Sequence, residues 1–257
     1  MITTVSLYQQ ICEARQKGKK LFAVLIDPDV SEPKRIRSLL NVAQVEGVDL
    51  LLVGGSLVAN DNAAKLLQYI RSCCTIPTVI FPGSLLQVND EADAILLLSL
   101  VSGRNPELLI GQHVVAAPIL KKMNIEVIST AYMLVDGGAP TTVSYVSNTQ
   151  PIPHNKPLIA ACTAMAAEMI GMKLLYLDTG SGAPKAVSEA MIESIRSSVE
   201  LPIIVGGGIR KAEQASALCK AGADVIVVGT LLEDKPHLLK TMANAIHNYN
   251  EQPTFSD

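Results

Sequence analysis

Eight short segments of the sequence are continuously apolar, and helical patterns follow most of them; this alternation constrains the fold more than any other feature. Uninterrupted apolar runs are typical of parallel strands buried on both faces. Eight β-α units predict an α/β fold, a (β/α)8 TIM barrel in which residues 1–257 form a single domain. An open doubly wound sheet is the alternative, but its glycine-rich loop usually follows the first strand, and here the glycines come late. The expected strands are 22–29, 48–56, 77–83, 94–103, 125–138, 173–182, 201–208 and 224–229.

Three stretches depart from a regular barrel. Residues 1–20 predict an extra amphipathic N-terminal helix; they lack the basic start and apolar run of a signal peptide. Ser84 to Asp93, between the third and fourth strands, is too short for a full crossover helix. Residues 137–156, after the fifth strand, carry no Asp, Glu, Lys or Arg before Lys156. We expect this long connection to be a polar loop that serves as a functional lid.

Composition excludes several classes of protein. Apolar residues make up 49% of the chain and charged residues 18%, and the net charge is −3. Neither a disordered chain nor a nucleic-acid-binding surface is therefore expected. Because no basic field exists to hold a polyanion, a phosphorylated substrate would need local backbone contacts.

The cellular location is predicted from two features. The nearest approach to a membrane span, residues 108–120, is too short to cross a bilayer. The cysteines are odd in number and form no C-x-x-C pair, which predicts a reduced, cytoplasmic protein with buried thiols. They are Cys12, Cys73, Cys74, Cys162 and Cys219.

Glycine-rich turns mark the expected site. Active sites of such barrels lie at the C-terminal ends of the strands, and a phosphate is commonly bound after the seventh and eighth. GGGIR and VVGT end those two strands, and GSGAP follows the sixth. Glycine lets backbone N–H groups approach phosphate oxygens closely, although it could also serve only to make tight turns. Other strand ends offer Asp29, Gly54, Gly55, Ser56, Pro82, Gly83, Ser102 and Asp136.

Two carboxylates at this end of the barrel are candidates for catalysis or metal binding. Tyr176 and Asp178 alternate along the sixth strand, which directs both toward the interior. There Asp178 could accept a proton from a substrate hydroxyl, or it could only cap the next turn. Asp27 ends the first strand, where a carboxylate suits Mg²⁺ that also binds substrate phosphates, or else an N-cap or ion pair. No spacing suggests zinc, and the four histidines are expected in surface or helix roles.

Taken together, these stretches resemble the geranylgeranylglyceryl phosphate synthase family, in its archaeal-type branch with bacterial members. The resemblance runs from about Phe22 to Glu233 through LIDPD, LLVGGS, FPGS, SGRNPELLIGQH, VSYVSNTQPIP, YLDTGSGAP, VGGGIR and VVGT. It implies a Mg²⁺-dependent prenyltransferase. The reaction joins geranylgeranyl or a similar polyprenyl diphosphate to the 3-hydroxyl of sn-glycerol 1-phosphate and releases diphosphate.

The same resemblance assigns roles to residues. It implies that Asp27 and Ser56 hold Mg²⁺, and that Asp178, at a position often occupied by Glu in the family, is the catalytic base. The residues implied for sn-glycerol 1-phosphate are Tyr176, Leu177, Asp178, Thr179, Gly180, Ser181, Gly182, Ala183, Gly207, Gly208, Gly229 and Thr230.

Further expectations concern partners and alternatives. The resemblance implies a homo-oligomer, a dimer or hexamer, with at most peripheral membrane contact and no nucleic acid. We expect an apolar trench for the prenyl tail where the helix between the third and fourth strands is missing, near Leu85 and Leu86. Two alternatives stay open: a phosphate-binding barrel enzyme of another phosphometabolite pathway, and a non-catalytic phosphometabolite-binding protein.

Overall fold

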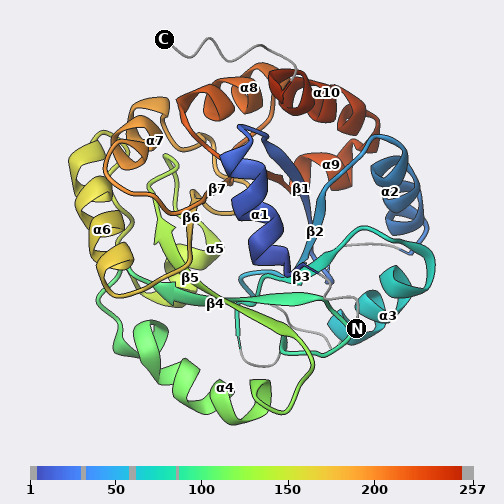
Figure 1. Ribbon diagram of the computed structural model, residues 1–257, viewed down its shortest axis with the longest axis horizontal. Helices are drawn as coiled ribbons and strands as arrows, with labels where there is room; N and C mark the ends of the chain where they lie inside the picture. The colour runs from blue at the N-terminus through green and yellow to red at the C-terminus, as the bar shows by residue number, and fades with distance from the viewer. Residues whose placement is uncertain (1–4, 30–32, 58–61, 85–86, 251–257) are drawn as a thin grey trace.

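The eight strands form a closed barrel, as predicted (Figure 1). The computed structural model describes residues 5–29, 33–57, 62–84 and 87–250. Neighbouring strands pair in parallel and in chain order, and β8 returns to β1 through pairs such as Ala23 with Val227. The strands are β1 (Leu21–Ile26), β2 (Leu50–Val53), β3 (Thr78–Ile80), β4 (Ala94–Leu100), β5 (Glu126–Leu134), β6 (Leu174–Asp178), β7 (Ile203–Gly206) and β8 (Val225–Val228).

Helices surround the barrel, and most strands begin and end inside the apolar runs that predicted them (Figure 1). The glycines, prolines and polar residues at the ends of those runs form the turns around the site. The helices are α1 (Leu7–Gln16), α2 (Pro33–Val45), α3 (Ala63–Cys73), the π-helix η2 (Glu107–Gly111), α4 (Gln112–Leu120), α5 (Thr142–Ser147), α6 (Pro157–Met169), α7 (Glu189–Arg196), α8 (Ala212–Ala221), α9 (Thr230–Asp234), the 3-10 helix η3 (Pro236–Leu238) and α10 (Leu239–Asn250).

Side chains alternate along the strands between two apolar layers. On β6, Leu175 and Leu177 belong to the layer between the strands and the helices. Leu174 and Tyr176 belong to the cluster that fills the barrel. Both layers are apolar, which explains why the strands read as continuous apolar runs and confirms the inward direction expected for Tyr176.

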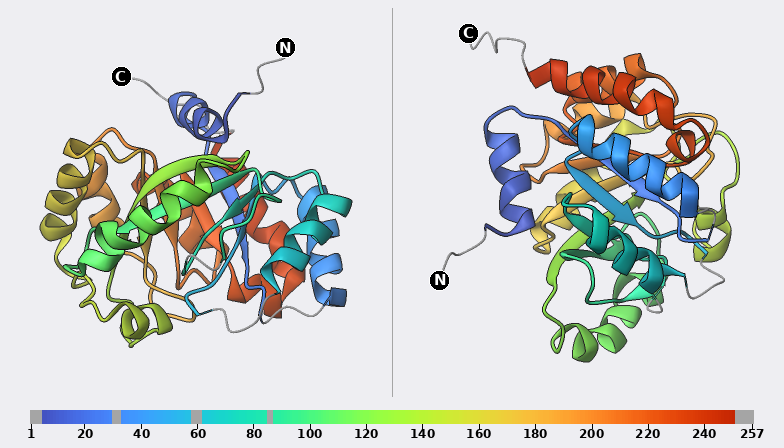
Figure 2. Two further views of the ribbon diagram at one scale, coloured as in Figure 1. Left: turned by 90° about the horizontal axis from the view of Figure 1, so that it is seen from below. Right: turned by 90° about the vertical axis from the view of Figure 1, so that its right-hand side faces the viewer.

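The N-terminal helix closes one end of the barrel. Leu7 and Ile11 of α1 pack into the interior cluster. The Glu126 carboxylate at the start of β5 accepts hydrogen bonds from the Leu7 and Tyr8 backbone N–H groups, and so caps the helix. α1 and α5 lie at opposite ends of the barrel (Figure 2), which leaves the end near α5 for ligands.

The irregular connections fall where the sequence placed them, with one correction. No α-helix joins β3 to β4 among the described residues 81–84 and 87–93, as expected. The connection after β5 is not a plain polar loop. It contains α5, whose N-cap residue Thr141 shares a capping box with Ser144, and Val135 pairs with Ile152 in a parallel bridge.

Two expectations about location have a structural outcome. None of the helices in the described part of the chain is long and apolar enough to cross a membrane. The five thiols are all free, but they are not all buried: Cys73 and Cys162 are exposed on α3 and α6, and only Cys219 is fully buried. The prediction of buried thiols was therefore wrong for the two that lie on outward helix faces.

Candidate active site

A buried carboxylate lies at the end of β6. Asp178 Oδ2 accepts a hydrogen bond of 2.6 Å from the Tyr132 hydroxyl, and Oδ1 accepts one of 2.7 Å from the Gly180 N–H. Burial raises the pKa of the Asp178 carboxyl above its ordinary value, and the two hydrogen bonds offset part of that rise. The group is thus a better proton acceptor than an exposed aspartate once it is ionised.

Three aromatic rings flank this carboxylate. Tyr132 and Tyr176 occupy paired positions on β5 and β6, and Phe81 follows β3. The Phe81 and Tyr176 rings stack with centroids 4.7 Å apart, and Tyr132 meets Phe81 edge-on at 5.9 Å. Burial raises the pKa of both tyrosines well above the ordinary value, so both hydroxyls remain protonated. The rings form an apolar boundary with a polar edge at Asp178.

The glycine turns after β6, β7 and β8 pack against one another and against Asp178. A methyl group on Gly207 would lie 2.6 Å from both Asp178 Oδ1 and Thr179 Oγ1. Ser181 and Thr230 join the turns after β6 and β8 through a 3.0 Å hydrogen bond between their hydroxyls. These contacts bring the predicted phosphate-binding residues together in one place. Glycine is required at Gly207 because its φ is +78° and no side chain would fit.

The cations near these turns lie at their rim. Arg210 Nη2 donates to the carbonyls of Gly182 and Ala183 at 3.1 and 3.2 Å, and so braces the turn after β6 from outside. Arg210 stands inside GGGIR, but it was not among the residues predicted for the site. Its contacts are consistent with the expectation that backbone groups, rather than a basic field, face a phosphate.

Asp27 and Ser56 stand at the ends of the paired strands β1 and β2. A methyl group on Gly55, next to Ser56, would lie 2.9 Å from Asp27 Oδ2. Asp27 Oδ1 accepts from the Asp29 N–H at 2.9 Å, which places Asp29 in a local turn. Burial raises the pKa of Asp27, while that hydrogen bond lowers it. The Asp27 N–H donates to Glu233 of α9, which ties the end of β1 to the turn after β8.

A buried glutamine joins the turns beside the Asp27 and Ser56 pair. Gln87 Nε2 donates to the Gly55 carbonyl at 3.1 Å, and its Oε1 accepts from the Gly83 N–H at 3.3 Å. Gln87 is 4% exposed. Its role could not be predicted from the sequence because its partners are backbone groups distant along the chain. It fixes the peptide next to Ser56.

The chemistry of Asp27 and Ser56 fits Mg²⁺. A carboxylate and a hydroxyl are hard oxygen donors, and Mg²⁺ is usually held by one or two carboxylates with waters and substrate phosphates. Elsewhere the described residues contain no group of three or more His, Cys, Asp or Glu side chains that could hold a metal. The pair therefore suits a cation that is completed by a phosphorylated ligand, rather than one enclosed by protein.

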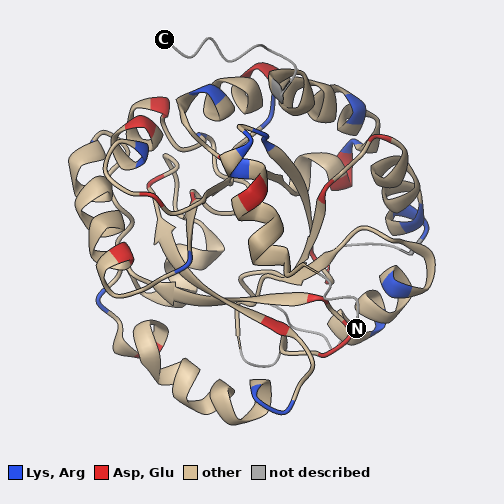
Figure 3. Ribbon diagram, in the orientation of Figure 1, with Lys and Arg blue, Asp and Glu red and all other residues tan. Residues whose placement is uncertain are grey.

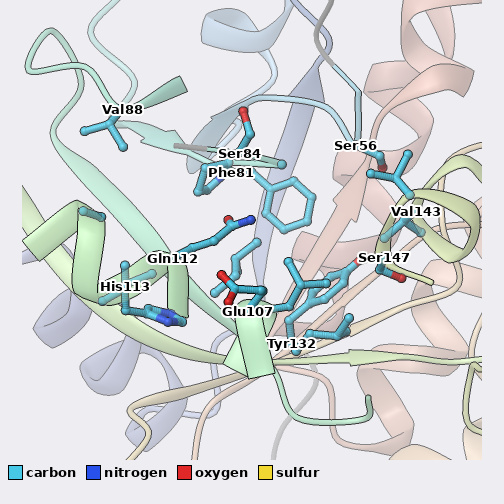
Figure 4. A pocket seen from close by; sticks show the side chains of 18 of the residues that line it. Ser56, Phe81, Ser84, Val88, Glu107, Gln112, His113, Tyr132, Val143 and Ser147 are labelled. Carbon is cyan, nitrogen blue, oxygen red and sulfur yellow. The ribbon is translucent and has the colours of Figure 1, made fainter. Parts of the chain in front are cut away.

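An apolar cavity of about 360 Å³ opens beside Ser56 and Tyr132 (Figure 4). It lies between β4 and the segment η2–α4, next to the position where a helix is missing after β3, and α5 contributes to its mouth. A cavity thus lies next to the connection where the trench was expected. Leu85 and Leu86 lie outside the described residues, and use of the cavity by a prenyl tail stays a prediction. Its apolar lining includes Phe81, Ile95, Leu97, Leu100, Leu108, Ala116, Leu120, Val143 and Val146.

Polar side chains reach the same cavity from η2 and α4 (Figure 4). His113 faces it, and the His113 Nε2 lies 3.3 Å from the Ser99 hydroxyl. A helix role was expected for His113; it lies on α4, but it also lines the cavity. Glu107 and Gln112 line it nearby. The π-helical turn of η2 adds a residue to the helix, a feature that is frequent at functional sites.

Some predicted positions contribute differently from what was expected. The Leu177 side chain lies in the outer layer, so it could touch a ligand only through its backbone. Asp136 is exposed and accepts from the Gly138 N–H in a local turn, because β5 ends earlier, at Leu134. Tyr132 was missed. Its position within a long apolar run carried no signal until pairing with β6 placed it opposite Tyr176.

The fold and site define a (β/α)8 barrel that combines glycine-rich phosphate-type turns with a deep apolar cavity. A model of the PcrB family matches residues 10–248, and the chain belongs to this family. It is 55% identical to geranylgeranylglyceryl phosphate synthase of Chitinophaga pinensis over 94% of this chain and 96% of the relative. It is 43% identical to the enzyme of the same name from Pyrococcus horikoshii over 84% of each chain.

A solved structure shares the whole fold. The (S)-3-O-geranylgeranylglyceryl phosphate synthase of Thermoplasma acidophilum, crystallised with its substrate sn-glycerol-1-phosphate, matches with a TM-score of 0.90 and 32% sequence identity. The match covers 95% of this chain and all of that one. The similarity is therefore not confined to the glycine turns.

We predict that Gly207→Ala destabilises the protein much more than Gly171→Ala. Both glycines have positive φ, +78° and +86°, so both variants lose about 1 kcal/mol through the backbone. Only the Gly207 methyl would meet other atoms, at Asp178 and Thr179, which should cost about 1–3 kcal/mol more. Denaturant unfolding measures both; equal losses would contradict the close packing of the site.

Proposed function

We propose that this protein is a prenyltransferase that joins a polyprenyl diphosphate to the 3-hydroxyl of sn-glycerol 1-phosphate. One observation carries the proposal: the apolar cavity and the glycine turns meet at the hydrogen-bonded pair of Tyr132 and Asp178. The relatives named above give the proposal its substrates. The product would be 3-O-geranylgeranyl-sn-glyceryl 1-phosphate when the donor is the geranylgeranyl compound.

The acceptor would bind at the polar end of the site. Backbone groups of Gly180 to Gly182, Gly207, Gly208 and Thr230 would hold the phosphate, in the manner of other barrels with glycine turns after strands seven and eight. The glycerol would then extend toward Asp178. That carboxylate, once ionised, accepts the 3-hydroxyl proton as the oxygen attacks the donor.

The prenyl donor would lie with its tail in the cavity and its diphosphate near Asp27 and Ser56. These two residues would hold Mg²⁺, which supplies neutralisation of the charge that grows on the leaving diphosphate. The chain's own contribution is orientation: the cavity fixes the tail, and Phe81, Tyr132 and Tyr176 exclude water from the reacting carbon. The ring faces also favour positive charge on an allylic carbon. Holding both reactants in line accounts for much of the acceleration.

Two other functions fit less of the structure. A barrel enzyme of another phosphometabolite pathway would use the glycine turns but has no need of an apolar cavity that reaches Tyr132. A non-catalytic phosphometabolite-binding protein has no need of a buried carboxylate beside that cavity. The location we propose is the cytoplasm, where the five free thiols would remain reduced.

The decisive assay uses labelled sn-glycerol 1-phosphate, Mg²⁺ and prenyl diphosphates of graded length. Wild-type protein should form a lipid-soluble phosphate. Asp178→Ala should lower the single-turnover rate by about 100-fold or more, since a general base contributes that much, while acceptor binding measured by calorimetry persists. No product at any chain length would refute the transferase. A variant that loses only affinity for the acceptor would refute Asp178 as base.

The cavity should set the length of the donor. Ala116 of α4 is 1% exposed and lines the cavity, whereas the adjacent Ala117 faces solvent. We predict that Ala116→Phe reduces kcat/KM for long prenyl diphosphates much more than for short ones, because the ring occupies the volume that the tail needs. Ala190→Phe, at an exposed position on α7 away from the cavity, is the control and should behave as wild type. Equal effects on all donor lengths would place the tail elsewhere.

We also propose that copies of the chain associate through α4 and α6. Figure 3 shows few charges on these two helices, and a groove between α6 and the adjoining η2 is lined by residues such as Leu109, Leu158 and Ile170. Exposed apolar side chains surround it. They are Ile110, Val114, Val115, Ile119, Leu158, Ile159, Met169 and Ile170. An apolar surface of this kind usually marks an interface.

Sedimentation velocity tests this association. Wild-type protein should sediment as a dimer or a larger oligomer, and Leu158→Asp should shift it toward monomer, because the interface would bury the new charge. Lys220→Asp on the exposed face of α8 is the control and should not change the oligomeric state. A monomeric wild type would refute the interface.

A further inference from the structure

We propose that Tyr132 is a positioning residue that holds Asp178 ionised and aimed at the boundary between the acceptor site and the donor cavity. The inference rests on the proposed function and goes beyond it, since it gives a role to a residue that contributes nothing to phosphate or metal binding. Its basis is the 2.6 Å hydrogen bond between the Tyr132 hydroxyl and Asp178 Oδ2.

Tyr132 lies where the cavity and the Asp178 carboxylate meet. The Tyr132 side chain lines the apolar cavity, whereas Asp178 is not among the described residues that line it. The nucleophile must reach a carbon atom inside that cavity, so the base has to act at its edge. Tyr132 is the group that contacts both the cavity and the carboxylate. It therefore occupies a position from which it can direct Asp178 toward the reacting atoms.

Two hydrogen bonds determine the orientation of the Asp178 carboxylate. Asp178 is held at both oxygens, by the Gly180 N–H on one side and by Tyr132 on the other. The Gly180 bond belongs to the turn after β6 and does not involve Tyr132. The Tyr132 bond crosses from β5 to β6 and holds Asp178 Oδ2. Without it the carboxylate could rotate about χ2, a soft torsion.

The groups around Asp178 determine whether its carboxylate is ionised. A buried carboxylate favours its neutral form, and donated hydrogen bonds favour the ionised form. The ionisable groups that interact with Asp178 are Tyr132 on β5 and Tyr176 on β6. Gly206, at the end of β7, packs against Tyr176, and Gly207, which follows the strand, packs against Asp178. The local cations Arg210 and Lys185 contact backbone or glycine rather than the carboxylate. Two donated hydrogen bonds, rather than an ion pair, thus maintain the charge of Asp178.

The aromatic neighbours hold Tyr132 in place. Its ring lies 5.9 Å from Phe81 and 5.8 Å from Tyr176, centroid to centroid, and only 6% of the residue is exposed. Removing the hydroxyl alone leaves all of these ring contacts unchanged. Tyr132→Phe is therefore a variant that tests the hydrogen bond rather than the packing.

The experiment compares Tyr132→Phe with wild type in single-turnover assays from acid to neutral pH. We expect a rate at least about tenfold lower, KM values for both substrates within about twofold, and an acidic limb of the pH profile that lies at higher pH. The direction follows because loss of a donor raises the pKa of Asp178, so ionised base is lost sooner as pH falls. Tyr249→Phe, a distant tyrosine on α10, should leave all three unchanged.

A second measurement does not depend on turnover. Carboxyl ¹³C NMR titration, with the Asp178 signal assigned from Asp178→Asn, should show a higher Asp178 pKa in Tyr132→Phe than in wild type. An unchanged titration, or an unchanged acidic limb with a raised donor KM, would overturn the inference and leave Tyr132 as a wall of the cavity. A wild type without transferase activity would refute the proposed function, and the titration would still decide the role of Tyr132.

Discussion

Burial of both faces of every strand is the constraint from which the rest of this structure follows. Strands that are apolar on both sides need one layer of side chains inside the barrel and another beneath the helices. The interior is then filled, with α1 closing one end through Leu7 and Ile11. A ligand can enter only at the other end, or through the wall where the helical layer is incomplete. The glycine turns lie at that open end, and the cavity lies at the gap in the wall.

The incomplete wall explains the position of the cavity. With no α-helix in the described part of the β3–β4 connection, space is left between the outer face of β4 and the segment η2–α4, and this space is the cavity. The cavity therefore begins at the strand ends, where polar chemistry occurs, and runs along the barrel wall, where the environment is apolar. A phosphorylated head group and a long apolar tail need those two environments side by side, and the barrel provides this continuity without a second domain.

Sequence patterns predicted the barrel, the strand ends and the glycine turns because each of these is a local property. Apolar runs, glycines with positive φ such as Gly207, and the short β3–β4 connection all act through neighbours along the chain. Tyr132, Gln87 and Arg210 were beyond reach for the opposite reason. Each acts through a partner on another strand or turn: Asp178, the Gly55 carbonyl and the Gly182 carbonyl. α5 was missed because its pattern is one helical turn inside a polar loop, too short for periodicity to detect.

The charge balance of the chain also takes on a more definite meaning. A net charge of −3 excludes binding of polyanions by bulk attraction, yet two phosphorylated substrates are proposed here. The apparent conflict disappears when charge is considered locally. Glycine turns offer backbone dipoles, Asp27 with Ser56 suits a cation that would arrive with the proposed donor, and Asp178 accepts hydrogen bonds from two neutral donors. A lysine or arginine beside Asp178 would compete with the glycine turns for the proposed acceptor phosphate, so neutral donors suit a site with the phosphate at one end and the hydroxyl at the other.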